Sequence, residues 1–409
     1  MKNRPDGFLI LIYLSLMAIG WVSIFFTTHQ HGDFKINTSY GMQLIWAGTS
    51  VVLGIFIYMI NKRFYYDFAS YIYLISTFLI VLVIFVGVEK SGAKSWLGIG
   101  RFGIQPAEVA KYATCLLLAR YVSGRSVDMS YWKNVLGAGI IVGIPILLIL
   151  LQNDTGTALP LLFLAFALFR EGLTKWILIF AFLAIAIFIY LAFYPQWILL
   201  VAIALIFTVL IVRDRKKKLM KIGRTIVVFA AIVSYIFTAD VIYHKALQPH
   251  QKMRIDTLLG KLDDHYHTKQ AKIAIGSGGL FGKGFGQGTQ TKLNFVPEQS
   301  TDFIFCTIGE EQGFVGTTLV ILLYILLIWR IIHRAEKSND TFIRCYGYCI
   351  ASIFFAHFAI NIGMTIGLMP VVGIPLPFIS YGGSSLWAFT LMLFTFINLD
   401  AHNTSKNWK

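Results

Sequence analysis

The chain has 409 residues, of which 57% are hydrophobic and only 13% are charged, and its mean hydropathy is +0.69. Apolar runs of about 18 to 25 residues recur from end to end, and each is long enough to cross a bilayer, which excludes a water-soluble domain. The net charge of +15 does not indicate nucleic acid, because most Lys and Arg fall in short loops on one side of the predicted spans. The sequence therefore predicts an all-α polytopic membrane protein.

Hydropathy places about twelve spans along the chain. They cover approximately 8–26, 42–60, 71–88, 105–121, a fifth ending near 152, a sixth ending at 169, 176–193, 197–212, 225–244, 303–332, 342–368 and 378–399. Lys2 and Arg4 place the N-terminus in the cytoplasm, and an even number of spans returns the C-terminus to the same side.

Charge fixes the sidedness of the loops. The segment 213–224 carries seven Lys and Arg residues, which indicates a cytoplasmic loop; a patch for anionic lipid is the alternative. The long hydrophilic segment 245–300 then lies outside. The segment 89–104 is also outside, and its many glycines favour a re-entrant or surface-lying stretch.

No metal site is expected from residue spacing. The four cysteines, which mostly fall in apolar spans, form no CxxC or CxxH pattern, and the histidines of the long outer loop have no zincin spacing. The glycine-rich run 276–288 fits no nucleotide-binding motif and is interpreted as a flexible, close-packed turn.

Asp302 is the predicted working residue, because it lies at the outer boundary just before an apolar run. A carboxylate there is costly unless it has a partner or a task. Polar groups from three outer segments are expected around it: Lys94, Trp96, Arg101, Gln105, Glu108, Lys111, Asp154, Gln251, Arg254, Lys272, Lys283 and Glu298. Cations beside an isolated carboxylate suit an anionic, lipid-linked substrate.

Several of these residues have a simpler interpretation. Glu108 and Lys111 are three apart on one helix face, so they can form an ion pair inside the bundle or contact substrate. Trp96 can anchor the chain at the membrane interface or stack on a sugar. The segment 373–385 breaks the last span, either for tight helix packing or to line a cavity.

The motifs SWLGIGRFGIQPAEVAK, NDTGTA, AIGSGGLFGKGFGQGTQTKLNFVPEQSTDFIF, GEEQGFVG and PLPFISYGGSS follow one another along the chain. In order and loop position they resemble the SEDS family (shape, elongation, division and sporulation), most closely its rod-elongation member. The similarity covers nearly the whole chain. Members of the family commonly have about ten spans, so the apolar hairpin 176–212 is interpreted as two additional spans. The chain is then a single membrane domain, 1–409, with about ten to twelve spans.

The resemblance implies a peptidoglycan glycosyltransferase of the bacterial cytoplasmic (inner) membrane that polymerises lipid II on the outer face and works with a class B penicillin-binding protein. It implies that the enzyme uses the Asp of the TDFIF motif, here Asp302, in catalysis. Trp96 matches the family's outer-loop Trp, and Ala107 replaces a common Ser beside Glu108 and Lys111. Ser380 and Tyr381 of the last motif join the predicted substrate-binding set.

The expected chemistry is attack of a sugar 4-hydroxyl on the anomeric carbon of a lipid pyrophosphate sugar, with inversion. Pyrophosphate needs charge neutralisation more than a proton, so one carboxylate base, Asp302, together with cations can suffice. Lys94, Arg101, Lys111 and Arg254 are the candidates for clamping the pyrophosphate, and Mg²⁺ or Mn²⁺ could share that work.

Two other classes of function remain open at this point. A lipid II flippase explains the many spans and the intramembrane polar residues, although it does not need a lone outer acid. A scaffold that only docks a transpeptidase explains least of the outer-loop polarity.

Overall fold

The protein is described by a computed structural model that covers residues 4–29, 35–90, 92–99, 102–194, 196–214, 219–241, 252–253, 256, 266–293 and 295–402. It divides into two compact units. The first comprises Met1–Leu173 and Tyr266–Lys409, and the second comprises Thr174–His265.

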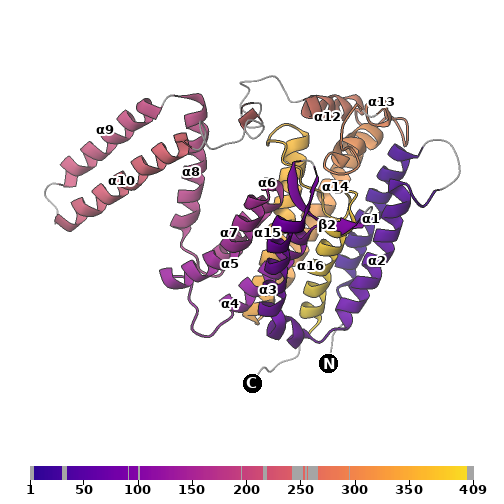
Figure 1. The fold of residues 1–409 in the computed structure, drawn as a ribbon, viewed down its shortest axis with the longest axis horizontal. Coiled ribbons are helices and arrows are strands. Elements are labelled where there is room, and N and C mark those ends of the chain that lie inside the picture. Colours follow the sequence, from indigo (N-terminus) through magenta and orange to yellow (C-terminus); the bar gives the residue numbers. More distant parts are fainter. Residues whose placement is uncertain are drawn as a thin grey trace. The chain divides into compact units, whose positions relative to one another are not determined.

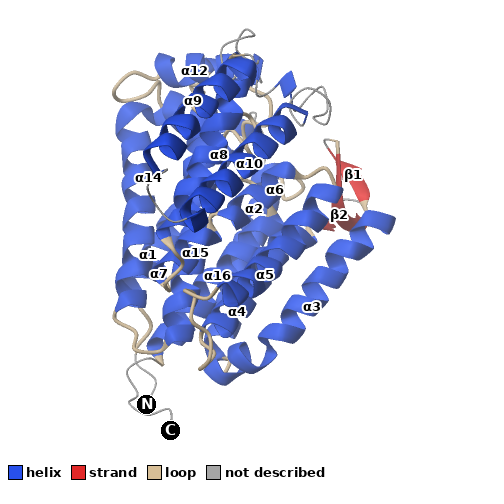
Figure 2. Ribbon diagram, turned by 90° about the vertical axis from the view of Figure 1, so that its left-hand side faces the viewer, coloured by secondary structure: helices blue, strands red, loops and turns tan. Residues whose placement is uncertain are grey.

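The first unit is a bundle of helices with one small sheet (Figures 1 and 2). Its elements are α1 (Gly7–Thr28), α2 (Ser39–Met59), α3 (Lys62–Val86), β1 (Val88–Lys90), β2 (Ala93–Ile99), β3 (Phe102–Ile104), α4 (Pro106–Val122), α5 (Trp132–Leu151), α6 (Thr155–Leu162), α7 (Leu164–Arg170), α12 (Tyr266–Ser277), α13 (Thr289–Lys292), α14 (Ile304–Glu336), α15 (Thr341–Thr365) and α16 (Gly383–Ala401).

Local sequence explains where several of these helices begin. Asp6, Asn61 and Asp340 cap α1, α3 and α15 by accepting hydrogen bonds from backbone N–H groups of the first turn. Pro106 is the first residue of α4, where its missing N–H costs nothing. Each start therefore follows from a residue type that stabilises a helix N-terminus.

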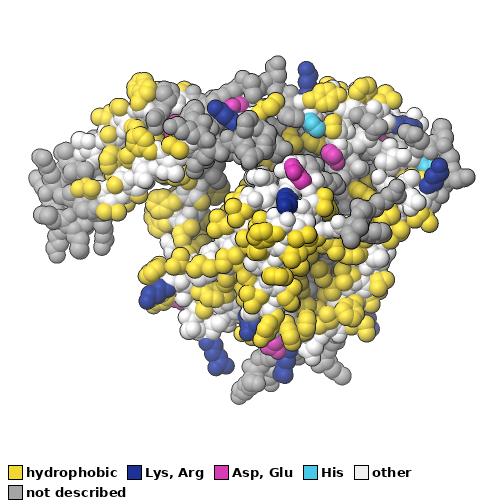
Figure 3. Space-filling view, viewed as in Figure 1, with side chains coloured by type: hydrophobic (Ala, Val, Ile, Leu, Met, Phe, Trp, Pro, Cys, Tyr) yellow, Lys and Arg dark blue, Asp and Glu magenta, His cyan; other side chains and the backbone are white. Residues whose placement is uncertain are grey.

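Seven helices among the described residues are long and apolar enough to cross a membrane: α1, α2, α3, α5, α14, α15 and α16. Large apolar side chains such as Leu74, Phe78 and Leu147 are exposed on the outside of the bundle. Figure 3 shows many apolar side chains over the middle of the first unit, with few Lys and Arg among them. An apolar exterior of this kind is the surface of a multi-pass membrane protein.

The expected spans fall on helices, with shifted ends. The third begins at Lys62 rather than near Tyr71, and the last begins at Gly383 after a non-helical stretch. The sixth is split into α6 and α7, which meet at Phe163 three residues after Pro160. Which of the shorter helices cross the bilayer stays a prediction.

The segment after α3 forms an antiparallel sheet of order β1-β2-β3, which the expectation of an all-α fold with a re-entrant or surface-lying stretch missed. Val88 pairs with Trp96, and Leu97 pairs with Ile104. Gly92 turns the first hairpin with a φ of 83°, a conformation that glycine adopts without strain. Hydrogen bonds between the strands satisfy backbone N–H and C=O groups of this glycine-rich segment, which would otherwise need water as a partner.

Both described chain ends lie at one end of the first unit, and the sheet and α12 lie toward the other (Figures 1 and 2). This arrangement is the one that the predicted sidedness requires, with both termini on one side and the segment before α14 on the opposite side.

The second unit contains α8 (Lys175–Phe193), α9 (Gln196–Asp214) and α10 (Leu219–Val241). Ile187 and Leu191 of α8 pack with Ile236 and Ala239 of α10 in a small apolar cluster. The hairpin expected at 176–212 corresponds to α8 and α9. Its being an addition to the family fold stays a prediction.

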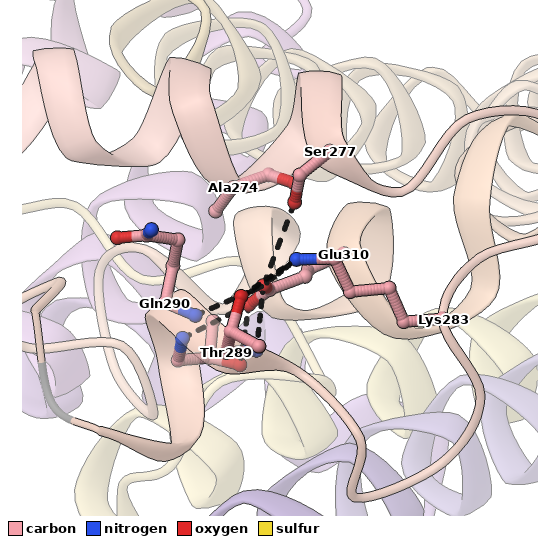
Figure 4. A network of polar contacts seen from close by, with 7 residues as sticks. Ala274, Ser277, Lys283, Thr289, Gln290 and Glu310 are labelled. Carbon is pink, nitrogen blue, oxygen red and sulfur yellow. Dashed lines mark hydrogen bonds and ion pairs between the residues drawn. The ribbon is translucent and has the colours of Figure 1, made fainter.

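A buried carboxylate in α14 holds the glycine-rich loop that follows α12 (Figure 4). Glu310 Oε1 accepts from Lys283 Nζ at 2.8 Å and from the backbone N–H groups of Thr289 and Gln290 at 2.8 and 2.9 Å. Its Oε2 accepts from Thr291 N and Oγ1 at 2.9 and 2.8 Å. Charge-assisted bonds to several donors make this a strong anchor.

The same loop packs backbone against backbone with α14, as expected of a close-packed turn, and its contacts do not support the flexible part of that expectation. A Cβ atom at Gly278 would lie 2.0 Å from Gly309 O, and one at Gly282 would lie 2.1 Å from Glu311 O. Gly313 interrupts α14 with a φ of 65°. Only glycine allows such an approach, so the loop is fixed on the helix.

We expect Glu310→Gln to lower the unfolding free energy of the purified protein by about 1 to 3 kcal/mol, because an amide NH2 in place of one carboxylate oxygen leaves buried N–H and O–H donors without an acceptor. Glu311→Gln is the matched control. Glu311 Oε1 accepts only from Gly286 N, at 3.0 Å, among the bonds that the described residues show, and an amide oxygen can replace it. Thermal unfolding in one detergent measures both variants, and an equal loss in the control would contradict the anchoring role.

Sidedness can be measured at two exposed lysines, Lys269 in α12 and Lys337 after α14. In a background without the four native cysteines, we expect Lys269→Cys to react with an impermeant thiol reagent in intact spheroplasts. Lys337→Cys should react only after permeabilisation. Labelling of both from outside would overturn the topology.

Candidate active site

Asp302 lies in a tight turn that precedes α14, and its side chain is partly buried. The turn is built on Glu298, whose φ is 52° and whose carbonyl accepts from the backbone N–H groups of Thr301 and Phe303, each at 3.1 Å. Glu298 itself is exposed, and its Oε2 accepts from Thr301 Oγ1 at 3.0 Å. The chain therefore presents Asp302 from a hydrogen-bonded turn rather than from a loose loop.

The PLPFISYGGSS segment lies directly against this turn. Ser380 Oγ donates to Thr301 O at 2.6 Å and accepts from Leu376 N at 2.8 Å. Tyr381 N donates to Ser300 O at 2.9 Å. Ser380 is buried, so the structure assigns its hydroxyl a bridge between two backbone segments. Its predicted contact with substrate would have to compete with that bridge.

Asn361 of α15 bonds both the Asp302 turn and the backbone just before the PLPFISYGGSS segment. Its Nδ2 donates to Asp302 O at 2.8 Å and to Ile374 O at 2.7 Å. Its side chain is fully buried. The backbone on which the catalytic candidate stands is thus bonded to the interior of the bundle.

The polar groups of α4 form a buried cluster. Lys111 Nζ donates to Glu108 Oε1 at 2.8 Å and lies 2.8 Å from His357 Nε2. It also lies over the ring of Phe389, 5.5 Å from its centroid. The ion pair considered from the spacing is present, and its lysine faces a carboxylate, an imidazole and an aromatic ring. Lys111 is fully buried, so a contact with pyrophosphate would have to displace one of these neighbours.

Asp154 and Gln105 meet at the start of α6. Asp154 caps this helix by accepting from Thr157 N at 3.0 Å, and its Oδ2 accepts from Gln105 Nε2 at 2.7 Å. A Cβ atom at Gly156 would lie 2.2 Å from Val372 O, and one at Gly373 would lie 3.2 Å from Asp302 Oδ2. The start of α6 therefore packs against the backbone at Val372, and the next residue, Gly373, lies beside the Asp302 carboxylate.

The sheet residues have neighbours of their own. Lys94 Nζ donates to Phe85 O, at 3.0 Å, and Lys94 N donates to Gln152 O, at 3.2 Å. A Cβ atom at Gly103 would lie 2.9 Å from the Trp96 ring. These contacts connect the sheet to the ends of α3 and α5.

Arg101 and Arg254, two of the expected pyrophosphate ligands, lie outside the described residues. Within the described part of the chain, no three His, Cys, Asp or Glu side chains gather as a protein-held metal site would require. A divalent cation is therefore not given a site by the residues that the structure describes.

Sequence reasoning missed residues of α15 and α12 that lie against the turn carrying Asp302. His357 and Asn361 are four apart in an apolar span, a spacing that places both on one helix face and could have been noticed. His267 of α12 stacks on Phe303, with ring centroids 6.1 Å apart. It had been considered only as a metal ligand, and the fold alone brings it beside the residue that follows Asp302.

The family model described as cell cycle protein, which groups FtsW, RodA and SpoVE, matches residues 7–209 and 199–405. The chain is 32% identical to peptidoglycan glycosyltransferase RodA of Treponema pallidum, over 93% of this chain and 94% of that protein. It is 35% identical to peptidoglycan glycosyltransferase MrdB of Escherichia coli, over 94% and 90%. Stage V sporulation protein E of Bacillus subtilis is 31% identical, over 96% and 95%.

Solved structures share the fold. A chain in a structure titled as a peptidoglycan synthase complex that coordinates polymerization and crosslinking aligns with a TM-score of 0.72 and 22% identity, over 98% of this chain and 99% of that chain. The rod shape determining protein RodA of Thermus thermophilus aligns with a TM-score of 0.65 and 23% identity, over the same shares. By the family model and by relatives above 30% identity, this chain belongs to the FtsW, RodA and SpoVE family, the SEDS family that its motifs resemble.

Proposed function

We propose that this protein is a peptidoglycan glycosyltransferase that polymerises lipid II during cell elongation, with Asp302 as the general base. Two of the relatives named above, RodA of Treponema pallidum and MrdB of Escherichia coli, are named peptidoglycan glycosyltransferases, and the alignments cover 94% and 90% of those proteins. The observation that carries the residue assignment is the placement of Asp302. It is partly exposed in the turn that precedes α14. That turn is bonded to α15 through Asp302 O and to the 373–382 segment through Thr301 O.

In the proposed step, the Asp302 carboxylate accepts the proton of the acceptor sugar's 4-hydroxyl. The hydroxyl oxygen forms the new bond to the anomeric carbon of the donor, from the face opposite the leaving group. The bond between that carbon and the pyrophosphate oxygen breaks, and the lipid pyrophosphate leaves with the electron pair. A positioned base contributes about 10² to 10⁴-fold to such a step.

Charge on the leaving pyrophosphate must be neutralised by cations. The buried pairing of Lys111 leaves Lys94, Arg101 and Arg254 as the predicted ligands. A divalent cation, if it takes part, would arrive with the pyrophosphate oxygens rather than in a cage of described side chains.

The flippase alternative is less well supported by the site. Transport needs a polar path through the bundle, but the polar groups of α4 and α15 are bonded to one another in the interior. The partly exposed carboxylate in the turn before α14 suits a reaction at the membrane surface better than a path across it.

We also propose the bacterial inner membrane as the location and a class B penicillin-binding protein as the partner. A neighbour in fold comes from a complex whose title joins polymerization to crosslinking. A polymerase that hands its glycan strands to a transpeptidase would benefit from being held beside it.

Asp302→Asn should abolish polymerisation by the purified protein while leaving its melting temperature and lipid II binding nearly unchanged. The amide keeps the size of the side chain and loses the ability to accept a proton, so the rate should fall by about 10² to 10⁴-fold. Gel analysis of glycan strands made from purified lipid II measures this. A well-folded Asp302→Asn protein that polymerises at the normal rate would exclude Asp302 as the base and favour the flippase.

Lys111→Met should behave in the opposite way. It leaves the buried Glu108 carboxylate without its cation, so we expect a loss of about 3 to 5 kcal/mol in stability rather than a selective loss of lipid II affinity. Thermal unfolding and lipid II binding on the same preparation distinguish the two. Weakened binding at an unchanged melting temperature would restore Lys111 as a pyrophosphate ligand.

The partner prediction is tested by co-purification in mild detergent. A class B penicillin-binding protein from the same cell should remain bound to the membrane domain and raise its polymerisation rate. If no such protein co-purifies and none changes the rate when added, the proposed partnership is wrong.

A further inference from the structure

We infer that Asn361 and His357 of α15 are positioning residues for the reaction, acting through hydrogen bonds that fix the backbone beneath Asp302. This inference rests on the proposed role of Asp302. The two residues do not touch the reacting atoms. Their role is to fix the position of the Asp302 carboxylate.

Asn361 supports the catalytic turn directly. One amide nitrogen donates to Asp302 O at 2.8 Å and to Ile374 O at 2.7 Å, so both of its hydrogens are used. Asp302 is thereby tied through its own carbonyl to the 374–382 segment, which returns through Ser380 to Thr301 O. The turn is held at two neighbouring carbonyls, which leaves little freedom for the side chain that it carries.

His357 supports the other end of the same segment, one helical turn earlier in α15. Its Nδ1 lies 2.9 Å from Pro375 O, and its Nε2 lies 2.8 Å from Lys111 Nζ. A carbonyl can only accept and an ammonium can only donate, so Nδ1 carries the hydrogen and Nε2 accepts. The neutral tautomer of His357 thus links the buried Glu108–Lys111 pair to the segment that faces Asp302.

Together the two residues form a continuous polar path from α4 to Asp302. His357 and Asn361 are four residues apart on one helix face, and they bond the adjacent carbonyls of Ile374 and Pro375. All of Lys111, His357 and Asn361 are fully buried. In the apolar interior of the bundle these bonds have no water to compete with them, so they hold one geometry.

The expected functional effect follows from geometry. A general base works only within hydrogen-bond reach of the proton that it removes, and a misplacement of about 1 Å can cost about 10²-fold in rate. Loss of the Asn361 bonds should therefore slow turnover without removing any group that touches lipid II.

Asn398 of α16 offers a matched control for the loss of a buried amide. It is also fully buried, and its Nδ2 donates to the carbonyls of Ile57, Tyr58 and Ile60 at 2.8, 3.0 and 2.8 Å. In both Asn361 and Asn398 the Oδ1 atom has no hydrogen-bond partner among the described residues. The two residues differ in what they support, since Asn398 bonds the end of α2 near the chain termini.

The experiment compares Asn361→Leu with Asn398→Leu in purified full-length protein. Melting temperature, lipid II binding and the rate of glycan polymerisation at saturating lipid II are measured for each. We expect both variants to melt earlier and both to bind lipid II, with kcat reduced about 10²-fold only in Asn361→Leu. Equal rates for the two variants would overturn the inference.

A second pair keeps the inference testable if Asn361→Leu does not fold. His357→Gln retains one donor and one acceptor on a planar amide, whereas His357→Leu retains neither. We expect His357→Gln to polymerise faster than His357→Leu at comparable lipid II affinity. Equal rates in this pair would contradict the positioning role of His357.

The same assays separate this inference from the proposed function. If Asp302→Asn is inactive while Asn361→Leu and His357→Leu turn over normally, Asp302 stays the base and the positioning role is wrong. If Asp302→Asn is itself fully active, the proposed function fails, and any slowing in the α15 variants then has another cause.

Discussion

The amide of Asn361, shared between the carbonyls of Asp302 and Ile374, is the interaction on which the site depends. Backbone that is not helical cannot satisfy its own polar groups, and inside a membrane bundle it persists only where other groups bond it. The turn at 297–303 and the segment at 373–382 are two such stretches, lying side by side. Asn361, Ser380 and the backbone of Tyr381 bond them to each other, and His357 bonds one of them to α4.

In this arrangement, the buried polar residues have a structural role, and the residue proposed to react is a different one. Glu108 and Lys111, which the sequence offered as an ion pair or as substrate contacts, lie in the interior and are bonded to each other. Through His357 this pair is connected to the 373–382 segment that faces Asp302. Asp302 is partly exposed in the turn that this segment supports. A similar division holds in the neighbouring loop, where the buried carboxylate of Glu310 gathers the backbone of 289–291 onto α14. The proposed reaction requires a base that is held in place, and the bonds of Asn361 and Ser380 hold the turn that carries Asp302.

Much of this could be predicted from the sequence. The length of the apolar runs predicted the membrane-spanning helices. The three-residue spacing of Glu108 and Lys111 predicted their ion pair. The sheet at 88–104 was missed because its short strands are rich in glycine and carry no clear alternation. The roles of Asn361 and His357 were missed because a lone polar residue in an apolar span looks the same whatever it bonds. Their partners lie as far as 59 and 246 residues away along the chain, and only the fold brings them together. Arg101 and Arg254 lie outside the described residues, so their predicted contacts with pyrophosphate stay predictions.

The central claim is that the Asp302 carboxylate meets the acceptor hydroxyl. A structure of the Asp302→Asn protein with two lipid II molecules bound, one as donor and one as acceptor, tests it most directly. The account predicts that the residue 302 amide lies about 2.6 to 3.2 Å from the acceptor 4-hydroxyl oxygen, with the Asn361 bonds to the carbonyls of residues 302 and 374 unchanged. An acceptor hydroxyl bonded instead to Glu298 or to Asp154, with residue 302 turned away from both sugars, would contradict it.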